Sequence, residues 1–590
     1  MISYIKKWLY WFHMKRHGIL FHNENDAQSL RISSRHTRYK NSGRIRVGGL
    51  VSDDVRQFIQ RHGYWISKEV NKNPEFYLYD ESLFLHFDAI NMINSTASIP
   101  TVLLLKKAPE NDAENIDINR VDAVVTCGDQ ALNYAKEHGW KVSLALDDYV
   151  DFIEYNPINH GNSGMSASIG IVLPRQEDSI FDNSRVKALL ERWARRSDLF
   201  IWRHELGSTP NYINKNILFL QCMRGTYNTP EDIDPDVDVQ VILNFTGMKS
   251  NHDFRLKHAA QGQIFADVFL SDGDYFIDDP IDGTRVSLET WLLEALENHG
   301  SILKKRSRLI RKIYSGHSLH SMINHICNHI ANRDFYNPGI SIIVSTNRPD
   351  YIDKILANYR RQKIGEKELI VVFHCDLKKQ KVNLDEYRSK IEHGEKIKIY
   401  KLDSQEISFG YALNFAVSMT SYPYVAKFDD DDYYAENFLI DILNAFEYSD
   451  AAICGRASFH TFFEANDTLI CRKPGVEYQY CTFLPGATLL IRSDVFQNVM
   501  FEDIPRDIDG RFCAACIERN YKIFTVDNFN ILVMRASDKM KHTWRASDMI
   551  VANQSLPVYP LIDTHLETNA VYFTPAPSVA VEDAIKFITV

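Results

Sequence analysis

Two short apolar runs flank a segment of helical periodicity at the start of the C-terminal half. The first run opens the stretch ISIIVSTNRPDYIDKILANYRRQ, which extends from Ile340 to Gln362 and passes through a polar turn into the helical segment. The second run, KELIVVFHCD, ends at Asp376. Strand, helix and strand in this order predict a parallel βαβ unit whose loops open at the carboxyl edge of a sheet.

A third apolar run, Tyr424 to Phe428, leads directly into four carboxylates, Asp429 to Asp432. The run predicts a buried strand that ends at the same sheet edge, so three segments converge on one cleft. Adjacent anions repel one another, and the cluster is costly unless a cation neutralises it. Mg²⁺ or Mn²⁺ suits carboxylate and phosphate oxygens. The alternative is a solvated acidic turn, because acidic runs are usually exposed.

The N-terminal half, from about Arg44 to Ser321, also alternates strand-like runs with helical patterns. The runs lie at Glu75–Tyr79, Thr101–Leu105, Ala123–Thr126, Ile169–Leu173, Leu199–Trp202 and Val239–Asn244. Such alternation predicts parallel sheets covered by helices. The linker HGNSGMS, residues 160–166, would divide two Rossmann-like halves at about 44–160 and 167–300.

Two further segments complete this division. Residues 301–330 form a basic amphipathic stretch, and we expect a helix that closes the first domain and links it to the second. Basic helices also bind calmodulin-like proteins or nucleic acid, but a connecting helix with a solvated face is the commoner outcome. The C-terminal tail, residues 546–590, contains several prolines that interrupt any long helix, and no chemistry is assigned to it.

Composition restricts the function. The chain has 590 residues, 45% of them hydrophobic, and a net charge of −10, which suits several globular domains and argues against a general nucleic-acid binder. Nine cysteines without a secretory signal suggest a reducing, cytoplasmic setting. The pair Cys513 and Cys516 lies in a helical pattern, where two small apolar positions one turn apart explain it better than a metal or redox site.

The first 18 residues, MISYIKKWLYWFHMKRHG, interleave aromatic and basic side chains. This composition is typical of a helix that lies in a membrane interface, which would give peripheral contact with the inner face of a membrane. The alternative, which we prefer, is an N-terminal helix within the arm 1–43 that packs on its own protein or on a second subunit, so an oligomer stays open. No run of 18 or more apolar residues occurs, so no spanning helix is expected.

The region from about Ile340 to Trp544 resembles the inverting family-two glycosyltransferases of the GT-A fold. The matching pieces are SIIVSTNRP, ELIVVFHCD, SFGYALNFAV, AKFDDDDYY, LPGATLLIRSDVF, IDGRFCAACIERNYKIF and KHTW. The resemblance implies a GT-A domain over residues 338–545. The expected fold class is therefore α/β, with a GT-B-like pair of Rossmann-like halves followed by a GT-A domain.

By this resemblance, several residues acquire roles around a nucleotide-diphospho-sugar, with a UDP-sugar as the first expectation. Donor base and ribose would lie near Thr346, Asn347, Arg348 and Asp376. Asp429 and Asp431 would form the D-x-D element, with Asp431 the direct ligand of Mn²⁺ or Mg²⁺. Asp430 would contact the donor, and Asp432 completes the cluster.

The acceptor hydroxyl must lose its proton as it attacks, and a carboxylate is a sufficient general base. Asp503, Asp507 and Asp509 precede a helical pattern, close to a helix N-terminus that favours anions. The family's usual glutamate-aspartate pair falls on Ile508 and Asp509. Either Asp509 acts alone, or Asp507 supplies the missing carboxylate from a shifted loop; Asp509 is the first choice and Asp503 the third.

One histidine also matches the family pattern. His542, in KHTW, corresponds to the late histidine that in relatives approaches the metal or the diphosphate. A packing role beside Trp544 is the alternative.

The N-terminal half resembles, more faintly, the CgeB-type GT-B glycosyltransferases. The pieces are NPEFYLYDES, SIPTVLLLKKAP, RVDAVVTCGDQALNYAKEHG and VQVILNFTGMKSNHDFRLKHAAQGQIF. The place of the ribose-binding glutamate is held by Lys257, and the paired arginines are replaced by Asp253 and Phe254. Lysine cannot accept a hydrogen bond from a ribose hydroxyl, so a degenerate module that positions an acceptor or partner is expected. An active second transferase stays open, because Arg255 could be a displaced member of the pair.

These observations predict metal-dependent, inverting transfer of a hexose-type sugar to a hydroxyl of a surface polysaccharide or other glycoconjugate. The alternative is an inactive protein on glycosyltransferase folds that binds carbohydrate or a partner. A protein acceptor or modified DNA is a third option, which the acidic charge makes less favourable for DNA.

Overall fold

In the computed structural model of the chain, the described residues are 46–48, 65–67, 76–80, 101–105, 121–146, 150, 155–158, 168–173, 183–195, 199–205, 217–229, 232–233, 239–246, 252–271, 274–279, 283–297, 299–318, 321, 325–326, 339–374, 382–402, 407–504, 507–538, 551, 555–557 and 579–590. The chain divides into two compact units, residues 1–103 with 109–122, and residues 104–108 with 123–590. The predicted N-terminal arm lies outside the described residues.

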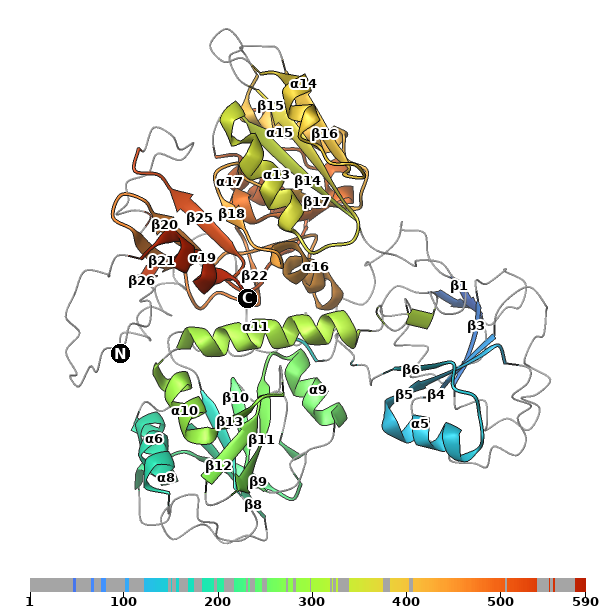
Figure 1. Cartoon of the computed structure of the whole chain (residues 1–590), viewed down its shortest axis with the longest axis vertical. Coiled ribbons are helices and arrows are strands. Elements are labelled where there is room, and N and C mark those ends of the chain that lie inside the picture. Colours follow the sequence, from blue (N-terminus) through green and yellow to red (C-terminus); the bar gives the residue numbers. More distant parts are fainter. Residues whose placement is uncertain are drawn as a thin grey trace. The chain divides into compact units, whose positions relative to one another are not determined.

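In the first unit, three short strands pair in parallel (Figure 1). Strand β1 (Arg46–Gly48) pairs with both β2 (Trp65–Ser67) and β3 (Phe76–Asp80). Strand β4 (Thr101–Leu105), which is divided between the two units after Leu103, is buried at every position. Strands β3 and β4 lie where apolar runs predicted them, because a continuous apolar run suits a strand that is covered on both faces.

The second unit begins with a βαβ element and continues with a seven-stranded sheet in the order β13-β12-β11-β10-β7-β8-β9. Five of these strands run parallel, and β12 and β13 join the edge antiparallel. The elements are β5 (Ala123–Cys127), α5 (Gly128–Glu137), β6 (Leu144–Leu146), β7 (Ile169–Val172), α6 (Ser184–Arg195), β8 (Leu199–His204), α8 (Ile217–Leu220), β9 (Met223–Tyr227), β10 (Val241–Asn244), α9 (His252–Ala260), β11 (Ile264–Ser271), β12 (Asp274–Asp278), β13 (Arg285–Ser287) and α10 (Leu288–Glu297). The predicted α/β alternation of the N-terminal half is confirmed.

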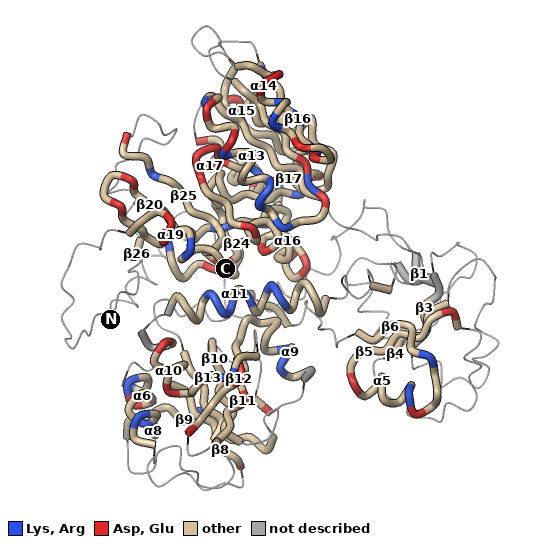
Figure 2. Tube along the Cα trace, in the orientation of Figure 1, with Lys and Arg blue, Asp and Glu red and all other residues tan. Residues whose placement is uncertain are grey.

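The basic stretch forms helix α11, His299–Gly316, and the described residues Ser321, His325 and Ile326 are also helical, so the predicted stretch 301–330 is interrupted after Gly316. Glycine disfavours continuation of a helix, and α11 ends at Gly316. The expectation of a solvated basic face was wrong for part of the helix. The Lys and Arg residues of α11 are the blue segments of its tube in Figure 2. Arg306 is nevertheless only 3% exposed, and Lys305 Nζ lies 2.8 Å from Asp279. Packing on α9 and α10 and on the C-terminal half buries much of this face.

The C-terminal half is built on an eight-stranded sheet, in the order β16-β15-β14-β17-β23-β19-β24-β22. Strands β16, β15, β14 and β17 are mutually parallel, and β23 pairs antiparallel with β17. The strands are β14 (Ile340–Thr346), β15 (Lys367–Phe373), β16 (Ile397–Lys401), β17 (Tyr424–Lys427), β19 (Ile453–Gly455), β22 (Gln479–Cys481), β23 (Leu490–Arg492) and β24 (Ile523–Thr525). All three predicted strands of this half are present.

Helices cover both faces of this sheet (Figure 1). Successive residues of β14 enter different cores: Ile342 joins the core that contains α13, α14 and α16, and Ile343 joins the core that contains α15 and α17. This alternation follows from the two-residue period of a strand. The helices are α13 (Ile352–Arg361), α14 (Leu384–Ser389), α15 (Phe409–Ser418), α16 (Phe438–Tyr448) and α17 (Ile508–Glu518), with short 3₁₀ turns η7 (Pro349–Tyr351), η8 (Gly486–Thr488) and η9 (Ser493–Gln497).

A second sheet, in the order β18-β25-β20-β21-β26, uses part of the C-terminal tail. Its strands are β18 (Tyr433–Tyr434), β20 (Phe459–Phe463), β21 (Thr468–Arg472), β25 (Ile531–Arg535) and β26 (Ser555–Pro557). Helix α19 (Val581–Ile588) buries Ala584 and Ile588 in the core of this sheet. The described parts of the tail therefore belong to the body of the C-terminal half.

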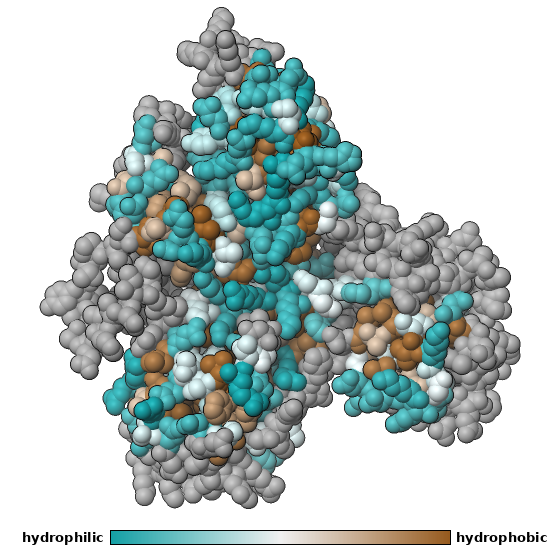
Figure 3. Space-filling model, viewed as in Figure 1, coloured by the Kyte–Doolittle hydropathy of each residue, from teal (hydrophilic) through white to brown (hydrophobic). Residues whose placement is uncertain are grey.

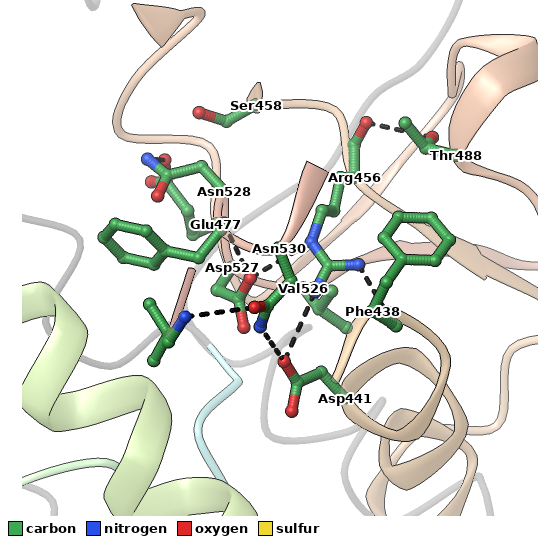
Figure 4. A network of polar contacts seen from close by, with 12 residues as sticks. Phe438, Asp441, Arg456, Ser458, Glu477, Thr488, Val526, Asp527, Asn528 and Asn530 are labelled. Atoms are coloured by element: carbon green, nitrogen blue, oxygen red, sulfur yellow. Dashed lines mark hydrogen bonds and ion pairs between the residues drawn. The ribbon is translucent and has the colours of Figure 1, made fainter. Parts of the chain in front are cut away.

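A buried polar network joins α11 to this half. Arg311 Nη2 on α11 donates to Asp441 Oδ2 on α16 at 3.0 Å. Arg456, which is fully buried, lies 3.5 Å from Asp441 and 3.1 Å from Asp527 (Figure 4). Burial raises the pKa of Asp441, and Arg311 opposes that shift. Buried charges are tolerated only when they are paired in this way.

A buried histidine makes stability depend on pH. His460 Nδ1 lies 2.9 Å from the carbonyl oxygen of Asn528, and burial lowers the pKa of His460 to about 4. An unfolded histidine titrates near 6.5, so below that pH the unfolded chain binds a proton that the folded chain refuses. The contribution of His460 to stability is complete above about pH 6.5 and is lost progressively as the pH falls toward about 4. From pH 7.5 to pH 5 we expect this residue to cost roughly 2 kcal/mol.

Urea unfolding at the two pH values tests this. The loss should be smaller in His460→Gln than in wild type, whereas His138→Gln, at an exposed position, should behave as wild type. An equal loss in wild type and His460→Gln would contradict the assignment.

Candidate functional site

The candidate site lies where β14, β15 and β17 end together. The parallel register pairs Thr346 with Phe373 and Ile343 with Lys427, so the acidic run leaves the sheet beside the end of β14. The carboxyl edge of a parallel sheet is the usual ligand edge of α/β proteins. The predicted convergence of three strand ends is confirmed.

Arg348 binds two members of the acidic run. Its Nε donates to Asp430 Oδ2 at 3.0 Å, and its Nη1 donates to Asp431 Oδ2 at 3.0 Å. The Thr346 hydroxyl donates to Asp430 and accepts the Arg348 backbone N–H at 2.9 Å. Burial raises the pKa of Asp430, and the hydrogen bonds of Arg348 and Thr346 oppose this shift. Predicted donor residues Thr346, Arg348 and Asp430 therefore lie together.

Lys427, the last residue of β17, contacts the first member of the acidic run. The residue is 4% exposed, and its Nζ forms an ion pair with Asp429. Burial lowers the pKa of Lys427, but the carboxylates of Asp429 and Asp509 outweigh burial, so the net shift is upward. The ammonium therefore stays charged between a predicted metal ligand and the predicted base.

Asp432 is held from behind. Its side chain accepts the Met534 backbone N–H at 2.9 Å, and Asn358 Nδ2 donates to its backbone oxygen at 2.9 Å. The residue is 3% exposed, and burial together with the charges of Asp431 and Asp429 raises its pKa well above the ordinary value. Asp432 therefore anchors the loop, whereas the side chains of Asp429 and Asp431 stay more exposed.

Of the three candidate bases, Asp509 is the one that has a hydrogen bond to the Gly486 turn, which precedes β23. It lies in the first turn of α17, and its Oδ2 accepts the Gly486 backbone N–H at 2.9 Å. Asp507 has a side chain that is 76% exposed and pairs with Arg511 at 3.7 Å. Asp503 accepts a hydrogen bond from Ser408 at the start of α15. This geometry favours Asp509 over Asp507.

The side chains of the described residues do not by themselves complete the coordination shell of a divalent ion. In the described part of the chain, no group of three or more His, Cys, Asp or Glu side chains is placed to hold a metal. Asp429 and Asp431 keep 34% and 21% of their side-chain surface exposed, against 6% for Asp430. Because Mg²⁺ and Mn²⁺ commonly take phosphate oxygens beside one or two carboxylates, the residues present fit an ion shared with a diphosphate.

Two cationic side chains of the protein reduce the electrostatic repulsion within the acidic run. Arg348 pairs with Asp430 and Asp431, and Lys427 pairs with Asp429. A divalent metal was the cation that the sequence suggested, and the roles of these two side chains as counter-ions were not foreseen. Lys427 was missed because it falls inside an apolar strand pattern; its position two residues before Asp429 was the available signal.

The other predicted site residues can be placed only in part. Asn347 follows the end of β14 and is exposed. Asp376 and His542 lie outside the described residues. His374, at the end of β15, was not singled out as a candidate, although its backbone N–H donates to Thr346 at 3.0 Å and burial lowers its pKa to about 4.

The N-terminal positions that carry the fainter resemblance are also visible. Lys257 Nζ lies 5.3 Å from the ring centre of Tyr155, and Arg255 Nη1 lies 3.8 Å from Asp267 Oδ2. Gly262 has φ +77°, and a Cβ there would come within 2.6 Å of Arg306 Nε. The tight turn thus serves the packing of α11, and a second active site stays a prediction.

Hydrophilic residues predominate on the described surface that Figure 3 presents. The exposed large apolar side chains of the described residues are Leu220, Leu270, Leu293, Tyr411, Phe483 and Met500. Among the helices that the structure describes, none combines the length and the apolarity that crossing a bilayer requires.

Comparison with solved structures returns glycosyltransferases of low similarity. S. aureus TarS 1-349 in complex with UDP-GlcNAc is 17% identical with a TM-score of 0.26, and the match covers 35% of this chain and 61% of that chain. The mannosyltransferase PcManGT from Pyrobaculum calidifontis, in complex with GDP-Man and Mn²⁺, is 13% identical with a TM-score of 0.26, over 35% and 59%. This chain therefore spans about three fifths of the length of these relatives.

Comparison with family models is more specific. No curated protein matches the chain. The model described as glycosyl transferase family 2 matches residues 341–494, which include β14, the acidic run and the Gly486 turn. The C-terminal half of this chain therefore contains a region, residues 341–494, that is similar to the family 2 glycosyltransferases.

Proposed function

We propose that this domain is a metal-dependent, inverting hexosyltransferase that moves a sugar from a nucleotide-diphosphate donor to a hydroxyl of a surface polysaccharide or other glycoconjugate. The supporting observation is the ion pair of Asp429 with the buried ammonium of Lys427, together with the position of Asp509, whose carboxylate lies at the same Gly486 turn as that ammonium. Two carboxylate groups at one sheet edge suit the two tasks of the reaction, which are leaving-group stabilisation and proton removal.

Each residue has a definite task in this proposal. Asp509 accepts the proton of the attacking hydroxyl, while the Gly486 N–H fixes the Asp509 carboxylate by a 2.9 Å hydrogen bond. Asp431 and Asp429 would hold Mn²⁺ or Mg²⁺, which when bound supplies Lewis-acid stabilisation of the departing diphosphate. Thr346, Asn347, Arg348 and Asp376 would line the base and ribose, with Asp430 fixed between Thr346 and Arg348.

The proposal also covers the N-terminal region, the cellular compartment and the partners of the protein. The N-terminal α/β region would position the acceptor or a partner, and His542 would approach the metal or the diphosphate. The cysteines within the described residues are all free, which supports a reducing, cytoplasmic setting. Peripheral membrane contact through residues 1–18, an oligomer, and the absence of a nucleic-acid partner belong to this proposal as well.

A panel of nucleotide sugars should identify the donor. A ligand that binds only the folded state stabilises it by mass action, by about 2.7 kcal/mol at 100 times its dissociation constant. We expect one nucleotide sugar with Mn²⁺, a UDP-sugar first, to raise the unfolding midpoint of the full chain, and Arg348→Ala to lose most of that increase.

Arg388 supplies the matched control for this experiment. It lies on α14, away from the acidic run, and its exposed guanidinium pairs with the exposed Asp385 at 3.6 Å. Arg388→Ala should therefore keep the full shift. A panel in which no nucleotide sugar shifts the wild-type midpoint would count against a donor site and favour the alternative, a protein that binds carbohydrate or a partner without catalysis.

A further inference from the structure

Lys427 is a charged side chain in a place where the sheet pattern calls for an apolar one. It ends β17, and its side chain is 5% exposed. A buried ammonium is stable only where opposite charges face it. The carboxylates whose charges act on it are Asp429, Asp509 and Asp432, from the loop after β17 and from α17.

The contacts of this ammonium are closely packed. Its Nζ pairs with Asp429 and lies 5.5 Å from the ring centre of Phe409, at the start of α15. A Cβ built on Gly486 would lie 2.9 Å from Lys427 Nζ and 3.3 Å from Asp509 Oδ2. Only glycine leaves room for the ammonium and the carboxylate to approach the same point of the turn.

We propose that Lys427 is a positioning residue that holds Asp429 and Asp509 at fixed places and limits how tightly the acidic run binds a divalent cation. This inference rests on the proposed function for the roles of the two carboxylates. The ammonium competes with a divalent ion for the charge of Asp429, and its charge also attracts the Asp509 carboxylate in the first turn of α17. Its removal should therefore tighten metal binding and slow transfer.

The first test is a titration of the full chain with Mn²⁺ alone, followed by the electron paramagnetic resonance signal of free Mn²⁺. Lys427→Met keeps the aliphatic stem and removes the charge. Because a unit charge a few ångströms away repels a divalent ion strongly at protein dielectric values, we expect the dissociation constant to fall by at least about tenfold. Lys390→Met, which removes an ammonium that pairs with the exposed Asp353 elsewhere, should leave it unchanged.

The second test separates positioning from charge. Gly486→Ala keeps every charge but places a methyl group between Lys427 and Asp509. We expect a lower kcat with donor KM and Mn²⁺ affinity close to wild type. Lys427→Met should also lower kcat, although it binds Mn²⁺ more tightly, and a merely destabilised protein would not combine these two changes.

The outcomes are decisive in both directions. Folded Lys427→Met that binds Mn²⁺ no more tightly than wild type, including the case in which neither binds it, overturns the proposal. If Lys427→Met does not fold, wild-type kcat in folded Gly486→Ala overturns it. The titration uses no donor, so its result stands apart from a failure to detect sugar transfer, which would count against the proposed function instead.

Discussion

Replacing Asp509 with asparagine is expected to lower the rate of sugar transfer by about 10²- to 10⁴-fold, the usual contribution of a positioned general base. Asparagine keeps the shape of the side chain and can still accept the Gly486 N–H, but it cannot take the proton of the acceptor hydroxyl. Donor affinity should change little, because the lost interaction acts on the acceptor. Initial rates of product formation at saturating donor measure the effect.

Asp507→Asn is the matched control for this prediction. Asp507 lies two residues away, carries the same charge, and is 76% exposed beside Arg511. Its replacement should leave the rate near wild type. The opposite pattern, with Asp507→Asn inactive and Asp509→Asn active, would assign the base to Asp507 from a loop that shifts when substrate binds.

The second large effect concerns stability. Replacing Arg311 with methionine should lower the free energy of unfolding by about 3–5 kcal/mol, because Asp441 loses a partner inside the protein. The side chains of Arg311 and Asp441 are 17% and 5% exposed, and Arg311 Nε and Nη2 both donate to the carboxylate. Arg456 and Asn530 still contact Asp441, so part of its charge stays compensated.

Urea unfolding of the full chain measures this loss. The double variant Arg311→Met with Asp441→Asn should recover part of the stability, because no unpaired carboxylate is then left. Arg308→Met, one turn earlier on the exposed side of α11, should change stability little. A loss below about 1 kcal/mol in Arg311→Met, the range of an exposed ion pair, would mean that α11 contributes little to the C-terminal half.

Much of the C-terminal sheet could be predicted because its central strands are covered on both faces. The runs that became β14, β15 and β17 are continuous and apolar, and each ends at a polar turn, so the sheet edge and the acidic run could be located together. Six strands of the N-terminal half, β3, β4, β5, β7, β8 and β10, were found in the same way. Sequence patterns of this kind depend on neighbouring residues, which is why they succeeded.

The features that sequence reasoning missed depend on partners far apart in the chain. Lys427 looks like a polar interruption of a strand until Asp509 and Gly486 are placed beside it. Arg311 of α11 looked solvated because its partner Asp441 is 130 residues away. Long-range charge pairs leave no periodic signal, so neither the counter-ions of the acidic run nor the buried network could be derived from the sequence.

The most direct measurement is release of nucleoside diphosphate from the donor by the full chain with Mn²⁺, in wild type and in Asp431→Ala. Asp385→Ala removes a carboxylate that is 96% exposed on α14 and serves as control. If the acidic run binds the metal and the diphosphate, wild type and Asp385→Ala should turn over the donor at similar rates and Asp431→Ala should lose nearly all turnover. Equal release by wild type and Asp431→Ala would contradict the account.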